Sequence, residues 1–170
     1  MPNWCENILE VTGPPAEVKR FRRETRGQDE LDFETILPTP PEMLNTTSNT
    51  GMPEWYNWRT SSAGWGTKWG VDIDGLDEAE GEVVYRFESA WSPPEAIVFQ
   101  LGAMYPALRF SLVYAEGGNC FAGSLVIDQG ELVEDQDFDS RDEDALYQFV
   151  LDRLGQDWKS WYEDEEDEDE

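Results

Sequence analysis

The residues best suited to bind a ligand are concentrated in one stretch, WYNWRTSSAGWGTKW, at positions 55–69. This stretch holds half of the eight tryptophans, together with a tyrosine, an arginine and a lysine. Tryptophan rings stack on bases or sugars and attract cations, and ligand pockets are largely apolar with a few converging polar groups. We predict an aromatic recess for a small ligand or nucleotide, formed by Trp55, Tyr56, Trp58, Arg59, Trp65, Lys68, Trp69 and Trp91.

An alternative role for the same rings is structural. Burying a tryptophan removes roughly 150–250 Å² of surface from water, so the rings would also serve as a second hydrophobic layer on the open face of a sheet. Sheets do bind single-stranded RNA through exposed aromatic side chains. The aromatic RNA-binding motif of such sheets is absent from this sequence, however, and the net charge opposes contact with phosphate.

The second chemical signal is the charge. The chain has 38 acidic and 12 basic residues, for a net charge of −26, and its last eight residues, 163–170, are all acidic. Removing those eight leaves −26 + 8 = −18, so the body is acidic as well. Such a field repels nucleic acid and anionic membranes, and it favours a basic protein surface as the partner. The candidate partner-binding carboxylates are Asp72, Asp74, Asp77, Asp137, Asp139 and Asp142.

Three explanations for the acidity stay open. The acidic residues would keep the protein soluble, adapt it to a high-salt habitat, or imitate DNA and so occupy a host DNA-binding or defence protein. Only three of the twelve basic residues are lysines, which favours the high-salt explanation. A basic stripe over 19–26 would pair with nearby carboxylates, or else dock an acidic partner or the acidic tail itself.

Catalysis that depends on histidine is excluded by composition. Without histidine there is no histidine base or histidine metal ligand, and Cys5 and Cys120 are too isolated to form a metal site. We therefore predict no cofactor and no metal. One enzymatic alternative is Pro2, which would become a secondary amine if Met1 were removed. Because no signal peptide or long apolar run opens the chain, we expect a cytoplasmic protein with reduced thiols.

The elements that must position these residues follow from hydrophobic patterning. Alternation of apolar and polar residues predicts strands, and apolar residues three or four positions apart predict helices. Pro-Pro pairs open the two expected helices over 16–26 and 92–104. The expected strands cover 3–12, 30–37, 66–74, 82–91, 108–116 and 120–128, with a short one at 131–133, and a last helix follows a capping box at 140–143.

The pattern strand, Pro-Pro, helix, strand occurs twice, at 12–21 and 91–101. Two such units predict an α+β fold, a decorated ferredoxin-like βαββαβ sandwich. In this interpretation a Trp-rich insertion at about 38–82 separates the two halves, and a C-terminal hairpin and helix are appended. Residues 1–157 form one domain, and residues 158–170 form a disordered acidic tail.

Four stretches resemble the YubB ferredoxin-like family. They are MPNWCENILEVTG, WYNWRTSSAGWGTKW, FESAWSPP and YAEGGNCFAG, in that order along residues 1–123. The family consists of uncharacterised proteins encoded largely on plasmids, phages and integrated elements. The resemblance implies the ferredoxin-like fold and no catalytic residues. Together with the charge, it leads us to expect a non-catalytic interaction protein of a mobile element.

Overall fold

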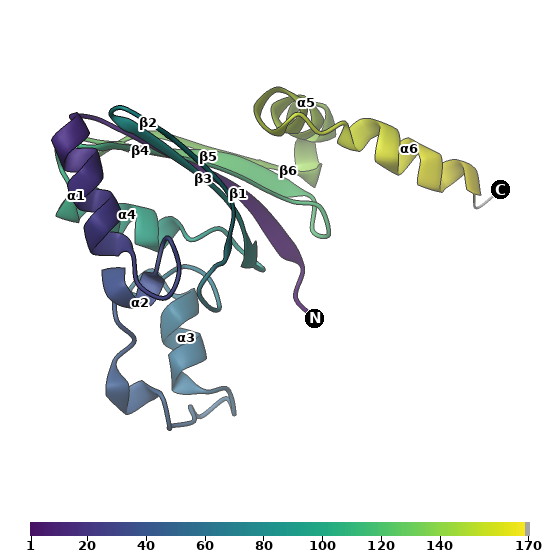
Figure 1. Ribbon diagram of the computed structural model, residues 1–170. Coiled ribbons are helices and arrows are strands. Elements are labelled where there is room, and N and C mark those ends of the chain that lie inside the picture. The colour runs from purple at the N-terminus through teal and green to yellow at the C-terminus, as the bar shows by residue number, and fades with distance from the viewer. Residues whose placement is uncertain (169–170) are drawn as a thin grey trace.

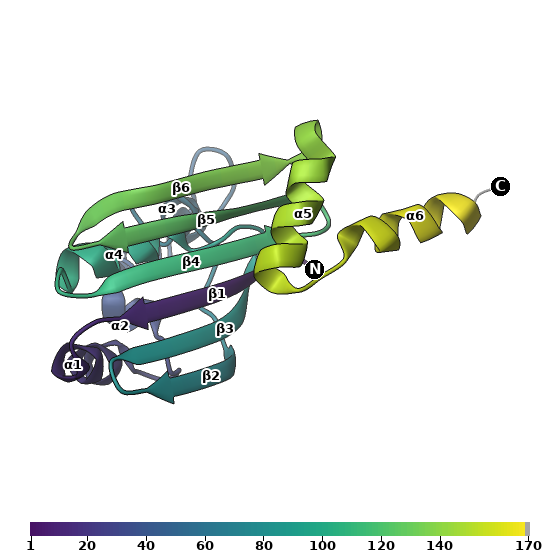
Figure 2. The same cartoon turned by 90° about the horizontal axis from the view of Figure 1, so that it is seen from above.

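The computed structural model describes residues 1–168, with side chains as far as residue 163. Six antiparallel strands form one sheet in the order β2-β3-β1-β4-β5-β6 (Figures 1 and 2). The strands are β1 (Trp4–Thr12), β2 (Ile73–Ala79), β3 (Glu82–Ala90), β4 (Arg109–Glu116), β5 (Phe121–Asp128) and β6 (Glu131–Asp139).

Helices cover the two faces of this sheet unequally. Figure 1 shows one face covered by α1 (Pro15–Thr25) and α4 (Glu95–Met104), with α2 (Phe33–Ile36) and α3 (Glu54–Thr60) beyond them. The opposite face carries α5 (Glu143–Leu154), and α6 (Trp158–Glu168) projects away from the body. Two short 3₁₀ turns, Pro41–Met43 and Ser140–Asp142, complete the described secondary structure.

Strand alternation sorts residues between the two faces. In β1, Cys5, Leu9 and Val11 are buried against α1 and α4, whereas Glu10 on the opposite face is exposed. The main core lies on the α1 and α4 side. A second, smaller core lies under α5, where Val113 of β4 meets helix residues that include Leu146 and Val150.

The ferredoxin-like prediction is confirmed. In chain order, β1, α1, β2, β3, α4 and β4 make the βαββαβ unit, and both helices that follow a Pro-Pro pair pack on one face of the sheet. α1 begins with Pro15, whose fixed φ suits the first position of a helix, and α4 begins directly after Pro94. The appended hairpin of β5 and β6 and the helix α5 are also present.

Two expected strands are wrong. Residues 30–37 contain α2, in which Phe33 and Ile36 are one helical turn apart and Asp32 caps the start by accepting from the Glu34 N–H. Residues 66–72 belong to no helix or strand, and the second strand of the fold is β2, which begins at Ile73. The Trp-rich insertion consequently lies between α1 and β2, inside the first half of the fold rather than between the halves.

The C-terminal part differs in detail from expectation. β6 runs to Asp139 instead of ending near residue 133, and α5 is capped by Asp142, which accepts from the Ala145 N–H, rather than by Ser140. The predicted disordered tail is helical over residues 158–168, which form α6. Residues 169 and 170 lie outside the described residues.

The two cysteines are both free thiols, with Cys5 buried in the main core and Cys120 half-buried in the β4–β5 turn. Burial, reinforced by the nearby charge of Glu116, raises the pKa of Cys5 far above its ordinary value. None of the helices within residues 1–168 combines the length and apolar character that crossing a membrane requires.

Phe21 is the centre of the main core, which makes it the first test of the fold. It is fully buried, and its ring meets those of Tyr85, Tyr105 and Phe110 edge-on at centroid distances of 5.4–6.2 Å. We expect Phe21→Ala to lower the free energy of unfolding by about 3–5 kcal/mol in urea titrations, because it leaves a cavity. The control Phe99→Ala, at a residue of α4 that is 46% exposed, should change it by less than about 1 kcal/mol. Equal losses in the two variants would contradict this arrangement.

Candidate functional site

The Trp-rich insertion is organised around Arg59, near the end of α3. Its guanidinium lies 4.4 Å from the ring centroid of Trp65 and 4.8 Å from that of Trp55. The same group donates to Glu34 at 2.8 Å and to the Thr39 hydroxyl at 3.0 Å. Arg59 therefore ties α3 to the segment around α2 through both ion pairing and cation–π contact.

Trp65 is the buried anchor of the same insertion. It is 1% exposed, its indole N–H donates to the Leu37 carbonyl at 2.8 Å, and its ring packs edge-on against Phe33 and Trp58. A pocket of about 300 Å³ opens beside Trp65 and Arg59, but its lining also includes the carboxylates Asp29, Asp32 and Glu34. Because Glu34 already neutralises Arg59, this pocket offers little to an anionic ligand.

Lys68 is the centre of a second aromatic group, which meets the Arg59 cluster where the Tyr56 ring lies 6.1 Å from that of Trp55. The ammonium of Lys68 lies 4.3 Å from the Trp69 ring and 5.8 Å from the Tyr56 ring, and Trp69 neighbours Trp4 at 6.4 Å. Trp91 is 43% exposed and has a φ of 70°, a left-handed conformation that is rare for a large side chain. Seven of the eight predicted residues thus form two adjoining aromatic groups, around Arg59 and around Lys68, and Trp91 lies exposed outside their ring and cation contacts.

A groove of about 670 Å³ runs between α1 and the β2–β3 hairpin. One wall carries the basic stripe of α1 and the other carries Glu78, Glu80 and Glu82. Arg22 bridges Glu30 and Glu78 across it, at 3.3 and 2.7 Å. The two walls of the groove thus carry opposite charges, and Arg22–Glu78 is the ion pair that joins them within the described residues.

The predicted partner-binding aspartates lie at opposite edges of the sheet. Asp74 and Asp77 belong to the edge strand β2, with Asp72 just before it, and Asp137 and Asp139 belong to the other edge strand, β6, with Asp142 just after it. Five strand spacings of about 4.8 Å separate the two edges by roughly 24 Å. These six carboxylates cannot act as one continuous stripe.

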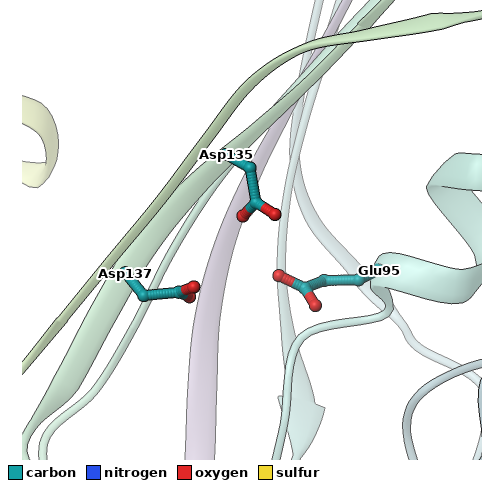
Figure 3. A group of neighbouring side chains, drawn as sticks. All are labelled: Glu95, Asp135 and Asp137. Carbon is teal, nitrogen blue, oxygen red and sulfur yellow. The ribbon is translucent and has the colours of Figure 1, made fainter.

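At the β6 edge, three carboxylates converge. Asp135 and Asp137 lie on the α4 side of the sheet, where Figure 3 shows them turned toward Glu95, the first residue of α4. One oxygen of each carboxylate lies within 4.8 Å of the others. Burial, then the charges of Asp137 and Asp135, raise the pKa of Glu95, although a contact with Tyr114 acts in the opposite sense. The buried Tyr114 hydroxyl donates to Asp137 at 2.7 Å.

Sequence reasoning missed Glu95 and Tyr114. Their meeting with β6 depends on α4 and β4 being packed together in space, which no spacing along the chain reveals. Asp135 was itself a sequence candidate for the acidic stripe beside Asp137, and residues two apart in a strand share a face. Pro2, the hypothetical catalytic amine, lies half-buried just before β1.

Comparison with known proteins identifies the architecture. Residues 64–168 match the model of a family described as the ferredoxin-like domain in Api92-like protein. The chain is also similar to the crystal structure of a protein, api92, from Yersinia pseudotuberculosis, with a TM-score of 0.56 and 10% identity. That match covers 82% of this chain and 99% of the other. Curated proteins give no significant match.

Arg59 gives a test of the insertion. We expect Arg59→Ala to lower the free energy of unfolding by about 1–3 kcal/mol and to speed proteolysis within residues 38–64, because two tryptophans and Glu34 lose a shared cation. The matched control is Arg23→Ala, since Arg23 forms no ion pair within the described residues. Unchanged proteolysis in Arg59→Ala would show that the insertion is held together by other contacts.

Glu95 gives a test of the convergent carboxylates. Since its folded-state pKa is raised above the ordinary value of 4.5, the folded state loses stability as pH rises from 4.5 through the folded pKa. We therefore expect Glu95→Gln to raise the melting temperature at about pH 7–8 and to lose this advantage below about pH 4.5. The control Glu131→Gln, at an exposed glutamate of β6, also removes one negative charge. It should raise the melting temperature by less, because it changes only the net charge of the chain. Identical pH profiles for the two variants would contradict the proposed crowding at Glu95.

Proposed function

We propose that this chain, which belongs to the family of ferredoxin-like domains in Api92-like proteins, is a non-catalytic interaction protein whose acidic surface binds a basic host protein. In this proposal it acts in the cytoplasm as the product of a mobile element, in keeping with its resemblance to YubB proteins. A host DNA-binding or defence protein, occupied by DNA mimicry, is the specific partner class that we propose.

The observation that carries the proposal is the uncompensated charge of β6. Most arginines with an ion pair lie elsewhere, on α1, in the insertion, or at the pairs Arg86–Asp77 and Arg109–Asp128. β6 itself contains no basic residue, and within the described residues its one ion pair joins Asp139 to the neighbouring Arg141. The other carboxylates of the strand have no basic partner within the described residues, although Asp137 accepts from the Tyr114 hydroxyl and Glu134 from the Ser124 hydroxyl: Glu131, Glu134, Asp135 and Asp137.

Carboxylates that are held in place on a folded strand are better suited to docking a partner than to increasing solubility alone. The carboxylates of β6 are fixed to a strand that pairs with β5 on both sides of a single register shift at Val133, so their spacing is set before a partner arrives. Charges that are already held in place steer the partner toward the surface and fix the register in which it binds. This chain then loses little conformational entropy on binding. By contrast, Arg59 in the aromatic cluster already has Glu34 as a partner, which is why we rank the acidic surface above the recess.

A paired salt titration tests this function. Charge-driven binding should weaken as salt rises from 0.1 to 1 M, because the Debye length falls from about 10 Å to about 3 Å. The assay measures displacement of labelled duplex DNA from a panel of basic host DNA-binding proteins, alongside the melting temperature of the chain. We expect displacement at 0.1 M salt and its loss at 1 M, with a modest change in melting temperature.

Two matched variants locate the surface. Each removes four negative charges, one at the β6 edge and one at the β2 edge. The β6 variant combines Glu131→Gln, Glu134→Gln, Asp135→Asn and Asp137→Asn. The control, at the β2 edge, combines Asp72→Asn, Asp74→Asn, Glu80→Gln and Glu82→Gln. We expect the β6 variant to lose the ability to displace DNA and the control to keep it. A large rise in melting temperature toward molar salt, with no displacement of DNA from any protein, would favour the high-salt explanation and remove support for this function.

A further inference from the structure

β6 is an edge strand, and no strand of the described chain pairs with its outer side. Among the strands of residues 1–168 it pairs with β5 alone, and it has nine residues, longer than the usual five or six, with one register shift at Val133 that leaves Glu134–Asp139 in regular pairing. Figure 2 shows its outer side uncovered until α5 begins beyond its C-terminal end. A long exposed edge presents a row of backbone N–H and C=O groups, and such a row is a template for another strand.

The charges of β6 indicate which strand would pair there. A second copy of β6 would bring like carboxylates face to face, which destabilises pairing. An extended segment rich in lysine or arginine would instead place opposite charges across the new pair. Leu132 and Val133, which are 48% and 54% exposed, add apolar surface for the aliphatic stems of such side chains.

We infer that the free edge of β6 binds an extended, basic segment of the partner protein as an added strand. This inference rests on the proposed function and specifies how the acidic surface would act. In this mode of binding, main-chain hydrogen bonds between the two strands provide affinity, and alternate side chains of the added strand provide specificity.

The register of β6 gives the recognition pattern. Asp135, Asp137 and Asp139 lie opposite Leu125, Gly123 and Phe121 of β5, and so they share the α4 face of the sheet. Basic residues at every second position of the added strand would lie beside Asp135 and Asp137 and near Glu95 (Figure 3), whereas Asp139 already has Arg141 as its partner. On the other face, Phe138 is stacked on Phe149, so the intervening residues of the added strand need no charge.

The test uses nine-residue peptides and the full chain. One peptide alternates lysine and threonine, and a second has the same composition with all lysines at one end. By fluorescence anisotropy at low salt, we expect the alternating peptide to bind at least about tenfold more tightly. Two further peptides carry backbone N-methyl groups on all lysines or on all threonines. Only alternate N–H groups of an added strand face β6, so one methylated peptide should lose binding and the other should retain it.

Protein variants locate the contact. Asp135→Asn with Asp137→Asn should weaken binding of the alternating peptide, whereas Asp74→Asn with Asp77→Asn, at the other edge, should leave it unchanged; circular dichroism confirms that both variants fold. Equal binding of the alternating and block peptides, insensitive to either pattern of N-methylation, would overturn strand addition while leaving the proposed function intact. No salt-sensitive binding of any peptide, together with no displacement of DNA, would overturn both.

Discussion

The central position of β1 constrains the rest of the structure. This strand pairs with β3 on one side and β4 on the other, and in both cases the register is continuous. Because its side chains alternate, Leu9 and Val11 must face α1 and α4 while Glu10 faces away. A shift of one residue would bury the carboxylates and expose the core, so the pairing of β1 fixes which face of every other strand is apolar. The acidic edge at β6 inherits its orientation from this register.

The parts of the fold that could be predicted have strong local signals. Prolines before α1 and α4, and alternating apolar residues in β1, β3 and β4, are sufficient to place those elements. β2 could not be predicted because its sequence, IDGLDEA, is polar and lies at an exposed edge. The strand expected at 30–37 resulted from its apolar content, although the spacing of Phe33 and Ile36 fits a helical turn better than a strand. Placing the insertion between the halves followed from these two errors.

For the candidate sites too, the sequence predicts contacts between residues that are close along the chain, and it does not predict contacts that depend on how the elements pack. Trp65 and Arg59 stand close together in the sequence, and their proximity in space could be anticipated. Whether Arg59 would be free for a ligand depended on Glu34, which lies 25 residues earlier and reaches it only after α2 and α3 pack. Likewise, the aspartates near 74 and those near 137 read as one acidic class in the sequence, but the strand order places them at opposite edges. Charge composition is a property of the chain, whereas charge geometry is a property of the sheet.

Because Cys5 is buried, thiol reagents should react with Cys120 in preference to Cys5. A thiolate is the reactive form of cysteine, and the core around Cys5 both disfavours that form and excludes the reagent. Cys120 is half-buried in the β4–β5 turn, with its sulfur 3.4 Å from the Tyr162 hydroxyl of α6. The natural chain thus has a single labelling position, without any engineered substitution. A fluorophore or spin label attached there would report on the docking of α6 from a place far from the α1 groove.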